Sequence, residues 1–263
     1  MSQEIITITN EYEVLDTLFE THESVFVVCG KSIQNLNIYS YLKKIEQKCK
    51  VIYFHDFQPN PTYASVVEGV QKFRQSNAKL IVAIGGGSAM DVAKCIKLFC
   101  NMNDDQLFIE QPIIPNNVHL IAMPTTAGTG SESTKFAVIY YNGVKQSVTD
   151  ESIIPSKIIF DSSALKTLPY SVRCSSMLDA LSHAIESYWS INSTDKSKAI
   201  AKEAIQMILK YKDQYLKNTD IGNAQMLKAA NLAGQAINIT QTTAGHAMCY
   251  KLTSLYSLQH GYA

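Results

Sequence analysis

The first half of the chain alternates short apolar segments with amphipathic ones, and this alternation limits the folds it can adopt. Strands are predicted at residues 25–29, 51–54, 80–84 and 119–123. Helices are predicted between them, at about 33–48 and 63–75. Strands that are apolar throughout and separated by helices are typical of a parallel sheet covered on both faces. The pattern predicts a doubly wound α/β nucleotide-binding domain, with ligands at the carboxyl ends of its strands.

A run of three glycines follows the third predicted strand, as Gly85-Gly86-Gly87-Ser88. Glycines let the backbone approach a ligand closely, and the next helix would direct its free N–H groups at a diphosphate. Ser88 could cap that helix or donate to the phosphate. A flexible strand-to-helix turn is the alternative, and the G-x-G-x-x-G spacing of Rossmann domains is absent.

A second polar loop, residues 124–134, follows the strand at 119–123 and is rich in threonine and serine. Its hydroxyl groups could bind a ribose or a carboxamide, and its place after a strand favours this over a plain surface loop. Short β-like segments then extend from 137 to 160, with Lys145 just after an Asn142-Gly143 turn.

The composition changes near Pro169, where long helical patterns begin. Helices are predicted at 172–189, 196–212 and 224–238, and again from residue 243. We therefore expect two domains, an α/β dinucleotide-binding domain over 1–169 and an all-α domain over 170–263.

The first predicted helix of this second half contains a polar pair, Asp179 and His183, in apolar surroundings. At i and i+4 the two side chains share one helix face and could bind one cation, although a buried Asp–His hydrogen bond is the alternative. His246 and His260 would lie about 21 Å apart in one straight helix, so the chain must turn between them if both bind the same ion. Residues 257–259 are a plausible turn, and Gly261 lets the backbone bend again.

Three histidines and one carboxylate suit Fe(II), Zn(II) or a similar divalent ion. Because only one ligand is anionic, the ion would keep net positive charge, as a Lewis acid requires.

Charge and cysteine content limit the partners and the compartment. The chain has 263 residues, with 23 basic and 23 acidic side chains, so its formal charge of zero favours neither nucleic acid nor an anionic membrane. We expect a cytoplasmic protein, because the sequence shows neither a signal peptide nor a spanning segment. The six cysteines have no C-x-x-C spacing, which favours reduced thiols.

Several motifs together resemble the iron-containing (group III) alcohol dehydrogenases, in the superfamily of glycerol dehydrogenase and dehydroquinate synthase. The gaps of 4, 63 and 14 residues between Asp179, His183, His246 and His260 are the most specific part. The other matching segments are Pro59-Asn60-Pro61, GGGSxxDxAK over 85–94, PTTAGTGSE over 124–132, Lys145, Asp161 before Leu168-Pro169, and DALxHAIExY over 179–188.

The resemblance implies a metal-dependent NAD(P)-linked enzyme that interconverts a short-chain alcohol and an aldehyde. The metal ligands would be Asp179, His183, His246 and His260. The cofactor-binding residues would be Asn60, Gly85, Gly86, Gly87, Ser88, Thr125, Thr126, Thr134 and Lys145. Dimers are frequent in the family, so a homodimer is one expected assembly.

The chain departs from the family pattern at three places. Gly30-Lys31 follows the first full strand where many members have an acidic residue, so NADP becomes as credible a cofactor as NAD. Tyr250 replaces a histidine proposed for proton relay, and it could serve catalysis or only pack. Family chains continue beyond the fourth ligand, so we expect an incomplete helical domain in which His260 lies close to a free end.

The sequence around His246 and around the glycine run is most similar to the phosphonoacetaldehyde reductase branch of this family. A cation near the metal would suit such a substrate, and Lys251 is either that cation or a solvated helix residue. Two alternatives to an alcohol dehydrogenase stay open: a lyase of the dehydroquinate synthase kind, and an inactive nucleotide-binding fragment.

Overall fold

The computed structural model describes residues 3–9, 11–256 and 258–263, apart from the side chains of Tyr250, Lys251 and Ser254. The chain forms two compact units that interleave along the sequence. Unit 1 comprises Met1–Pro124 and Lys135–Phe160, and unit 2 comprises Thr125–Thr134 and Asp161–Ala263. The domain boundary that the sequence places near Pro169 stays a prediction.

Unit 1 is built on a six-stranded sheet with the order β1-β8-β5-β4-β2-β3. The strands are β1 (Glu4–Ile8), β2 (Ser24–Cys29), β3 (Lys50–Phe54), β4 (Leu80–Gly85), β5 (His119–Pro124) and β8 (Lys157–Asp161). Pairing is parallel between β2 and β3, β2 and β4, β4 and β5, and β5 and β8. All residues of β2 are buried, in agreement with its apolar run from Val25 to Cys29.

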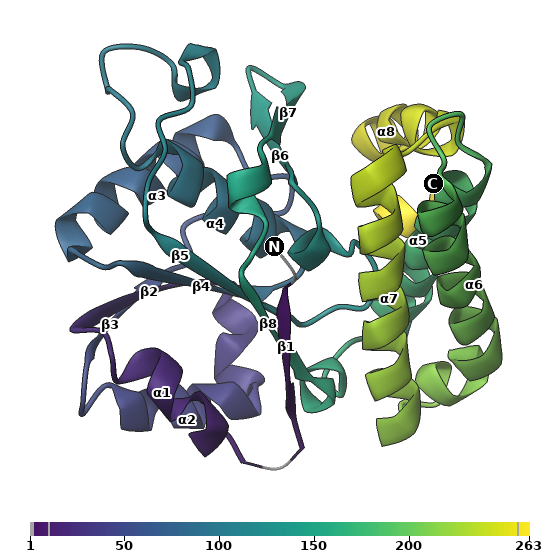
Figure 1. The fold of residues 1–263 in the computed structure, drawn as a ribbon, viewed down its shortest axis with the longest axis horizontal. Coiled ribbons are helices and arrows are strands. Elements are labelled where there is room, and N and C mark those ends of the chain that lie inside the picture. The colour runs from purple at the N-terminus through teal and green to yellow at the C-terminus, as the bar shows by residue number, and fades with distance from the viewer. Residues whose placement is uncertain (1–2, 10, 257) are drawn as a thin grey trace. The chain divides into compact units, whose positions relative to one another are not determined.

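Helices cover both faces of this sheet, with α3 and α4 on one face and α1 and α2 on the other (Figure 1). Their bounds are α1 (Asp16–Phe19), α2 (Asn37–Ile45), α3 (Tyr63–Ser76) and α4 (Gly87–Phe99). Four short 3-10 helices accompany them, η1 (Glu13–Leu15), η2 (Lys31–Asn35), η3 (Phe108–Glu110) and η5 (Glu151–Ile153). Phe26, Phe54 and Phe73 pack together in the core between the sheet and α3. The doubly wound α/β prediction is confirmed.

A two-stranded hairpin, β6 (Phe136–Tyr141) and β7 (Val144–Thr149), completes unit 1. Its turn is Asn142-Gly143, and both residues have positive φ, 49° and 74°. Asparagine and glycine accept this conformation at low cost, so the predicted turn is confirmed. Lys145 lies two residues after Gly143, paired with Tyr140 on the opposite strand.

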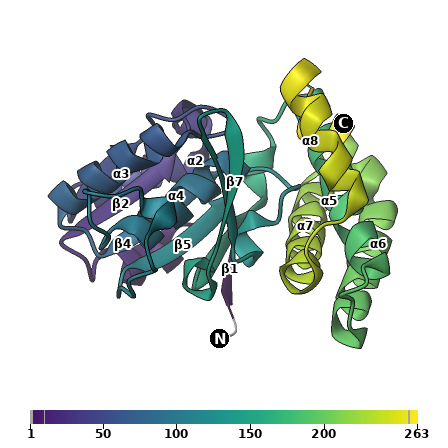
Figure 2. The same ribbon diagram turned by 90° about the horizontal axis from the view of Figure 1, so that it is seen from above.

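Unit 2 is helical, and α5, α6 and α7 pack against one another (Figure 2). Its helices are α5 (Tyr170–Trp189), α6 (Asp195–Leu216), α7 (Asp220–Thr240) and α8 (Ala244–Tyr256), with the 3-10 helices η4 (Ser131–Ser133), η6 (Ser162–Leu165) and η7 (His260–Tyr262). Thr194 caps α6 through a reciprocal capping box with Ser197, and Thr219 caps α7. The predicted all-α region is confirmed, and its four long helices begin within about four residues of their predicted starts.

Two local predictions are wrong. Ser88 does not cap α4, because the helix begins one residue earlier and Gly86 is the N-cap. The helix predicted over 33–48 is divided at Leu36, whose extended backbone separates η2 from α2. Among the described residues, none of the helices combines the length and the apolar composition that a bilayer-spanning segment needs.

Candidate metal centre

Helix α5 supplies the first two predicted ligands from one buried face. Asp179 and His183 are 5% and 6% exposed, and Glu186, one turn further on, is 3% exposed. These residues stand at i, i+4 and i+7, which places all three on the same side of a helix. Three buried polar side chains on one face require partners, and those partners come from the end of the chain.

His246 and His260 reach the same place from two different elements. His246 lies in α8, which ends at Tyr256, and His260 begins η7, so the chain leaves the α8 axis between them. The rings of His246 and His260 have centroids 5.3 Å apart. Of the predicted turn, Ser257 lies outside the described residues. Gly261 packs directly on the Ser175 carbonyl of α5, where a side chain could not fit.

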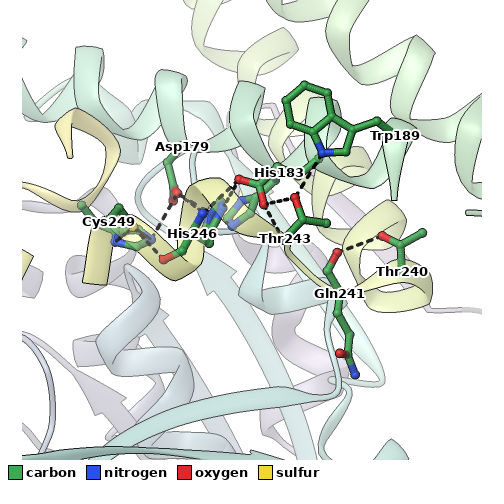
Figure 3. Close-up of polar contacts among 10 residues, drawn as sticks. Asp179, His183, Trp189, Thr240, Gln241, Thr243, His246 and Cys249 are labelled. Atoms are coloured by element: carbon green, nitrogen blue, oxygen red, sulfur yellow. Dashed lines mark hydrogen bonds and ion pairs between the residues drawn. The ribbon is translucent and has the colours of Figure 1, made fainter. Parts of the chain in front are cut away.

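All three histidines converge on one carboxylate oxygen. Asp179 Oδ1 lies 3.8 Å from His183 Nε2, 3.6 Å from His246 Nε2 and 3.7 Å from His260 Nε2. Ligand atoms of Asp179, His246 and His260 all lie within 4.8 Å of one another. Figure 3 shows Asp179, His183 and His246 pointing toward one another.

These separations suit a shared cation better than direct hydrogen bonds. They exceed the N···O distance of a hydrogen bond. Two atoms each about 2.1 Å from one ion lie about 3.4 Å apart at the tetrahedral angle. His246 Nε2 is buried and lacks a hydrogen-bond partner among the described residues. The residues present therefore fit a divalent metal ion.

The electrostatic environment keeps this donor set ready to bind a metal. Burial acts to raise the pKa of Asp179, but the facing histidines, His183 first, outweigh it and hold that pKa below its usual value. Burial lowers the pKa of His183, against the opposing charge of Asp179. At neutral pH, Asp179 is therefore ionised and His183 is neutral, the forms that coordinate metals.

Glu186 contacts His246 at Nδ1, the ring nitrogen that points away from Asp179. Its Oε1 lies 2.6 Å from His246 Nδ1 and accepts the His246 backbone N–H at 3.2 Å. Its Oε2 accepts the Thr243 hydroxyl at 2.7 Å and also the Thr243 backbone N–H. Burial of His246 acts to lower its pKa, but the facing carboxylates of Asp179 and Glu186 raise it above the usual value. Glu186 was not predicted as a site residue, although its i+7 spacing from Asp179 places it on the same helix face.

Cys249 was also not singled out as part of the site. Its Sγ lies 3.5 Å from His260 Nδ1 and 3.2 Å from the His246 carbonyl oxygen. The thiol lies three residues after His246 in α8, so it faces the same side of the helix.

The glycine run lies in unit 1, at the carboxyl end of β4. Gly85 ends the strand, Gly86 is the N-cap and Gly87 begins α4, without a capping side chain among the described residues. A side chain on Gly85 would approach Ala89 Cβ to 2.6 Å. The start of α4 thus lies directly after a strand end, and its role in binding a diphosphate stays a prediction.

The other predicted cofactor residues are divided between the units. Asn60 and Lys145 belong to unit 1, where Asn60 has a left-handed backbone with φ of 58° just before α3. Thr125, Thr126 and Thr134 belong to unit 2, and the Thr134 hydroxyl donates to the Ser131 carbonyl. Their role in binding a cofactor stays a prediction. The Tyr250 and Lys251 side chains lie outside the described part of the chain.

Comparison with known proteins gives the family. The profile of the family described as iron-containing alcohol dehydrogenase matches residues 2–162. The profile of its C-terminal part, Fe-containing alcohol dehydrogenase family, C-terminal, matches residues 173–263.

Among curated relatives, an NAD-dependent methanol dehydrogenase from Bacillus methanolicus is 37% identical over 80% of this chain and 57% of its own length. Alcohol dehydrogenase 4 from Schizosaccharomyces pombe is 32% identical over 91% of this chain and 58% of its own. This chain thus spans less than two thirds of the length of these relatives.

Solved structures agree with the family match. An iron-containing alcohol dehydrogenase from Thermococcus thioreducens is similar with a TM-score of 0.90 and 27% identity, over 98% of this chain and 71% of that one. Sulfoacetaldehyde reductase from Bifidobacterium kashiwanohense, solved with NAD⁺, has a TM-score of 0.89 and 27% identity, over 98% and 71%. The shared fold and both matching profiles show that this chain belongs to the iron-containing alcohol dehydrogenase family.

Proposed function

We propose that this chain carries the dinucleotide-binding and metal-binding parts of an NAD(P)-linked, metal-dependent oxidoreductase that interconverts a short-chain alcohol and an aldehyde. The observation that carries the proposal is the convergence of His183, His246 and His260 on Asp179 Oδ1. Family membership supports it independently. Because the chain covers only 57% and 58% of two relatives, the activity of the whole protein is part of the proposal.

The four proposed ligands set the charge of the site. Asp179 contributes one negative charge, and three neutral imidazoles contribute none, so a divalent ion would keep a net charge near +1. A bound Fe(II) or Zn(II) supplies a Lewis acid toward a substrate oxygen, while the nicotinamide of NAD or NADP exchanges hydride. In unit 1, the N-terminus of α4 would hold the diphosphate, with Ser88 in its first turn.

We propose that Tyr250 transfers the proton at the substrate oxygen. The residue lies in α8 one turn after His246, on the helix that carries a proposed metal ligand. Replacement by phenylalanine tests this role, because Tyr250→Phe removes the hydroxyl and keeps the ring. We expect a lower kcat with unchanged metal content.

The substrate proposed is a small aldehyde, with anionic aldehydes such as phosphonoacetaldehyde tested first. A similar solved structure is a sulfoacetaldehyde reductase, whose substrate name denotes an anionic two-carbon aldehyde. Acetaldehyde and propionaldehyde are the matched neutral substrates.

We also propose a cytoplasmic location for the protein, because its six free cysteines suit a reducing compartment.

Metal content per chain tests the proposed function most directly. We expect about one equivalent of iron or zinc after anaerobic purification and a clear loss in His260→Ala, since structural and catalytic sites need their full ligand set. Aldehyde reduction by the metal-loaded protein is then measured with NADH and NADPH. A protein without metal, or one that binds a dinucleotide without turnover, would contradict the proposal.

A further inference from the structure

We propose that Glu186 is the positioning residue of the metal centre, holding the His246 ring by Nδ1 so that Nε2 faces the ion. This inference rests on the proposed function, since it concerns the same metal site. Glu186 contacts His246 at Nδ1, the ring nitrogen opposite the one that faces the proposed ion. It therefore acts on a metal ligand without being one.

The contacts of Glu186 fix the tautomer of His246. An ionised carboxylate only accepts hydrogen bonds, so the 2.6 Å contact from Nδ1 to Oε1 requires a proton on Nδ1. In the neutral imidazole, Nε2 then carries the lone pair. That nitrogen is buried, lies 3.6 Å from Asp179 Oδ1, and has no hydrogen-bond partner among the described residues. A cation in front of it would satisfy an otherwise costly buried group.

The same carboxylate fixes the position of the whole first turn of α8. Glu186 accepts from the backbone N–H groups of Thr243 and His246, which the start of a helix leaves unsatisfied. A negative charge at this helix end also complements the helix dipole. Figure 3 shows Thr243 beside the His246 region, with the dashed contacts that join this cluster.

Glu186 and two of the proposed metal ligands lie on one helix, α5. Asp179, His183 and Glu186 all lie in α5, so this helix provides two proposed ligands and the group that orients a third. Glu186 is 3% exposed and accepts four hydrogen bonds, from the backbone N–H groups of Thr243 and His246, the Thr243 hydroxyl and His246 Nδ1. Hydrogen bonds of this kind raise the basicity of a coordinating imidazole and hold its orientation.

Gly245 shows how closely α8 approaches this carboxylate. A Cβ at Gly245 would lie 2.6 Å from Glu186 Oε1. A side chain at position 245 would therefore displace the Glu186 carboxylate from its present contacts with Thr243 and His246.

The test measures the dissociation constant of Co(II) by competition with a chromophoric chelator. Glu186→Gln keeps the size and one acceptor but removes the charge and gives the amide a donor that faces Thr243. We expect Co(II) binding to weaken by about 10- to 100-fold, as is typical for partners of metal-binding histidines. The visible spectrum of bound Co(II) should also change, because it reports the ligand geometry. Glu203→Gln, an exposed glutamate in α6, is the matched control and should bind as the wild type.

A double-mutant cycle separates positioning from general structural damage. If Glu186 acts through His246, Glu186→Gln has little further effect on Co(II) binding in a His246→Ala background. Additive losses would overturn the proposal, as would wild-type affinity and spectrum in Glu186→Gln. Circular dichroism and Trp189 fluorescence identify any variant that fails to fold, and Glu186→Asp then provides the milder replacement. Failure of the wild-type protein to bind metal would instead overturn the proposed function.

Discussion

Gly245 is the single residue whose replacement tests the contact between α8 and α5 most simply. Glycine to alanine within a helix ordinarily stabilises a protein by roughly 0.5–1 kcal/mol. Here the new methyl group would meet Glu186 Oε1 at 2.6 Å and displace a carboxylate that has four donors. We expect Gly245→Ala to lower the free energy of unfolding by about 1–3 kcal/mol, measured by urea titration with Trp189 fluorescence, and to weaken metal binding.

Gly30→Ala is the control for this prediction. Its Cβ would meet only Ser32 Oγ, at an ordinary 3.6 Å, and the backbone of Gly30 has a φ of −74° that alanine accepts. We expect no loss of stability there. Equal stability of Gly245→Ala and the wild type would show that the carboxylate can move at little cost.

The cysteines provide a test of burial that depends on pH. Burial raises the pKa of Cys29 from 9.0 to about 12, so about one thiol in ten thousand is ionised at pH 8. Cys174 is the one cysteine that is not buried. We therefore expect iodoacetamide at pH 8 to label Cys174 first, as measured by peptide mass spectrometry, and the other five after denaturation.

The sign of the pH effect on stability follows from the same shift. A thiol whose pKa is raised in the folded protein favours folding below its unfolded pKa, and this contribution is lost as the pH rises from 9 toward 12. Rapid labelling of Cys29 at pH 8 would contradict the buried position of β2.

At the level of elements, the sequence predicted those whose hydrophobic pattern is long or uninterrupted. Strands β2 to β5 and helices α3 and α5 to α7 were placed from pattern alone. Strand β1 was not predicted, although four of its five residues are β-branched, a composition typical of strands. The order of the strands in the sheet depends on long-range pairing, which the local sequence does not carry.

The site was predicted less completely than the fold. The four proposed ligands were named from their residue types and spacing and then from the family resemblance, but Glu186 was not, because its partner His246 lies 60 residues away on another helix. Ser88 was expected as a possible cap, yet Gly86 can take the N-cap position as well. Both cases depend on where backbone N–H groups point, which the residue type alone does not determine.

A pocket lies at the carboxyl ends of β2 and β3, and its charge predicts which dinucleotide binds. Lys31 follows β2 and His55 follows β3, and they line a pocket of about 260 Å³ with Thr62 and Ser65. The Asp56 carboxylate in this pocket is paired with Lys72 at 2.5 Å, which lowers its pKa. Positive charge and hydroxyl groups at this sheet edge suit a 2′-phosphate.

We therefore expect NADPH to bind more tightly than NADH, as measured by titration calorimetry. Lys31→Glu should weaken NADPH binding by about 10- to 100-fold, because hydrogen bonds to charged groups contribute roughly 1.5–3 kcal/mol. It should change NADH binding little. Lys202→Glu, an exposed lysine of α6, has the same charge change and should keep the wild-type preference. Equal affinities for both dinucleotides in the wild type would contradict this assignment.

At the scale of the whole molecule, the two kinds of proposed site belong to different units. Asp179, His183, His246 and His260 all lie in unit 2, while the glycine run and the Lys31 pocket lie in unit 1. The units interleave, since residues 125–134 belong to unit 2 although they follow β5 directly. A ten-residue polar loop has no hydrophobic pattern of its own, so the sequence could not assign it to the helical part.

We expect amide hydrogen exchange to show that the metal ion protects unit 2 and that the dinucleotide protects unit 1. A ligand stabilises the folded state that binds it by RT ln(1 + [L]/Kd), about 2.7 kcal/mol at 100 times Kd, which slows exchange through opening of that unit by about 100-fold. Zn(II) should therefore protect α5 and the start of α8, where the amides of Thr243 and His246 donate to Glu186. The bound dinucleotide should protect the end of β4 and the first turn of α4. In His260→Ala we expect the Zn(II) protection to disappear and the dinucleotide protection to remain. Protection of β4 and α4 by Zn(II) alone, without protection of α5 and α8, would contradict a metal site built from the residues of unit 2.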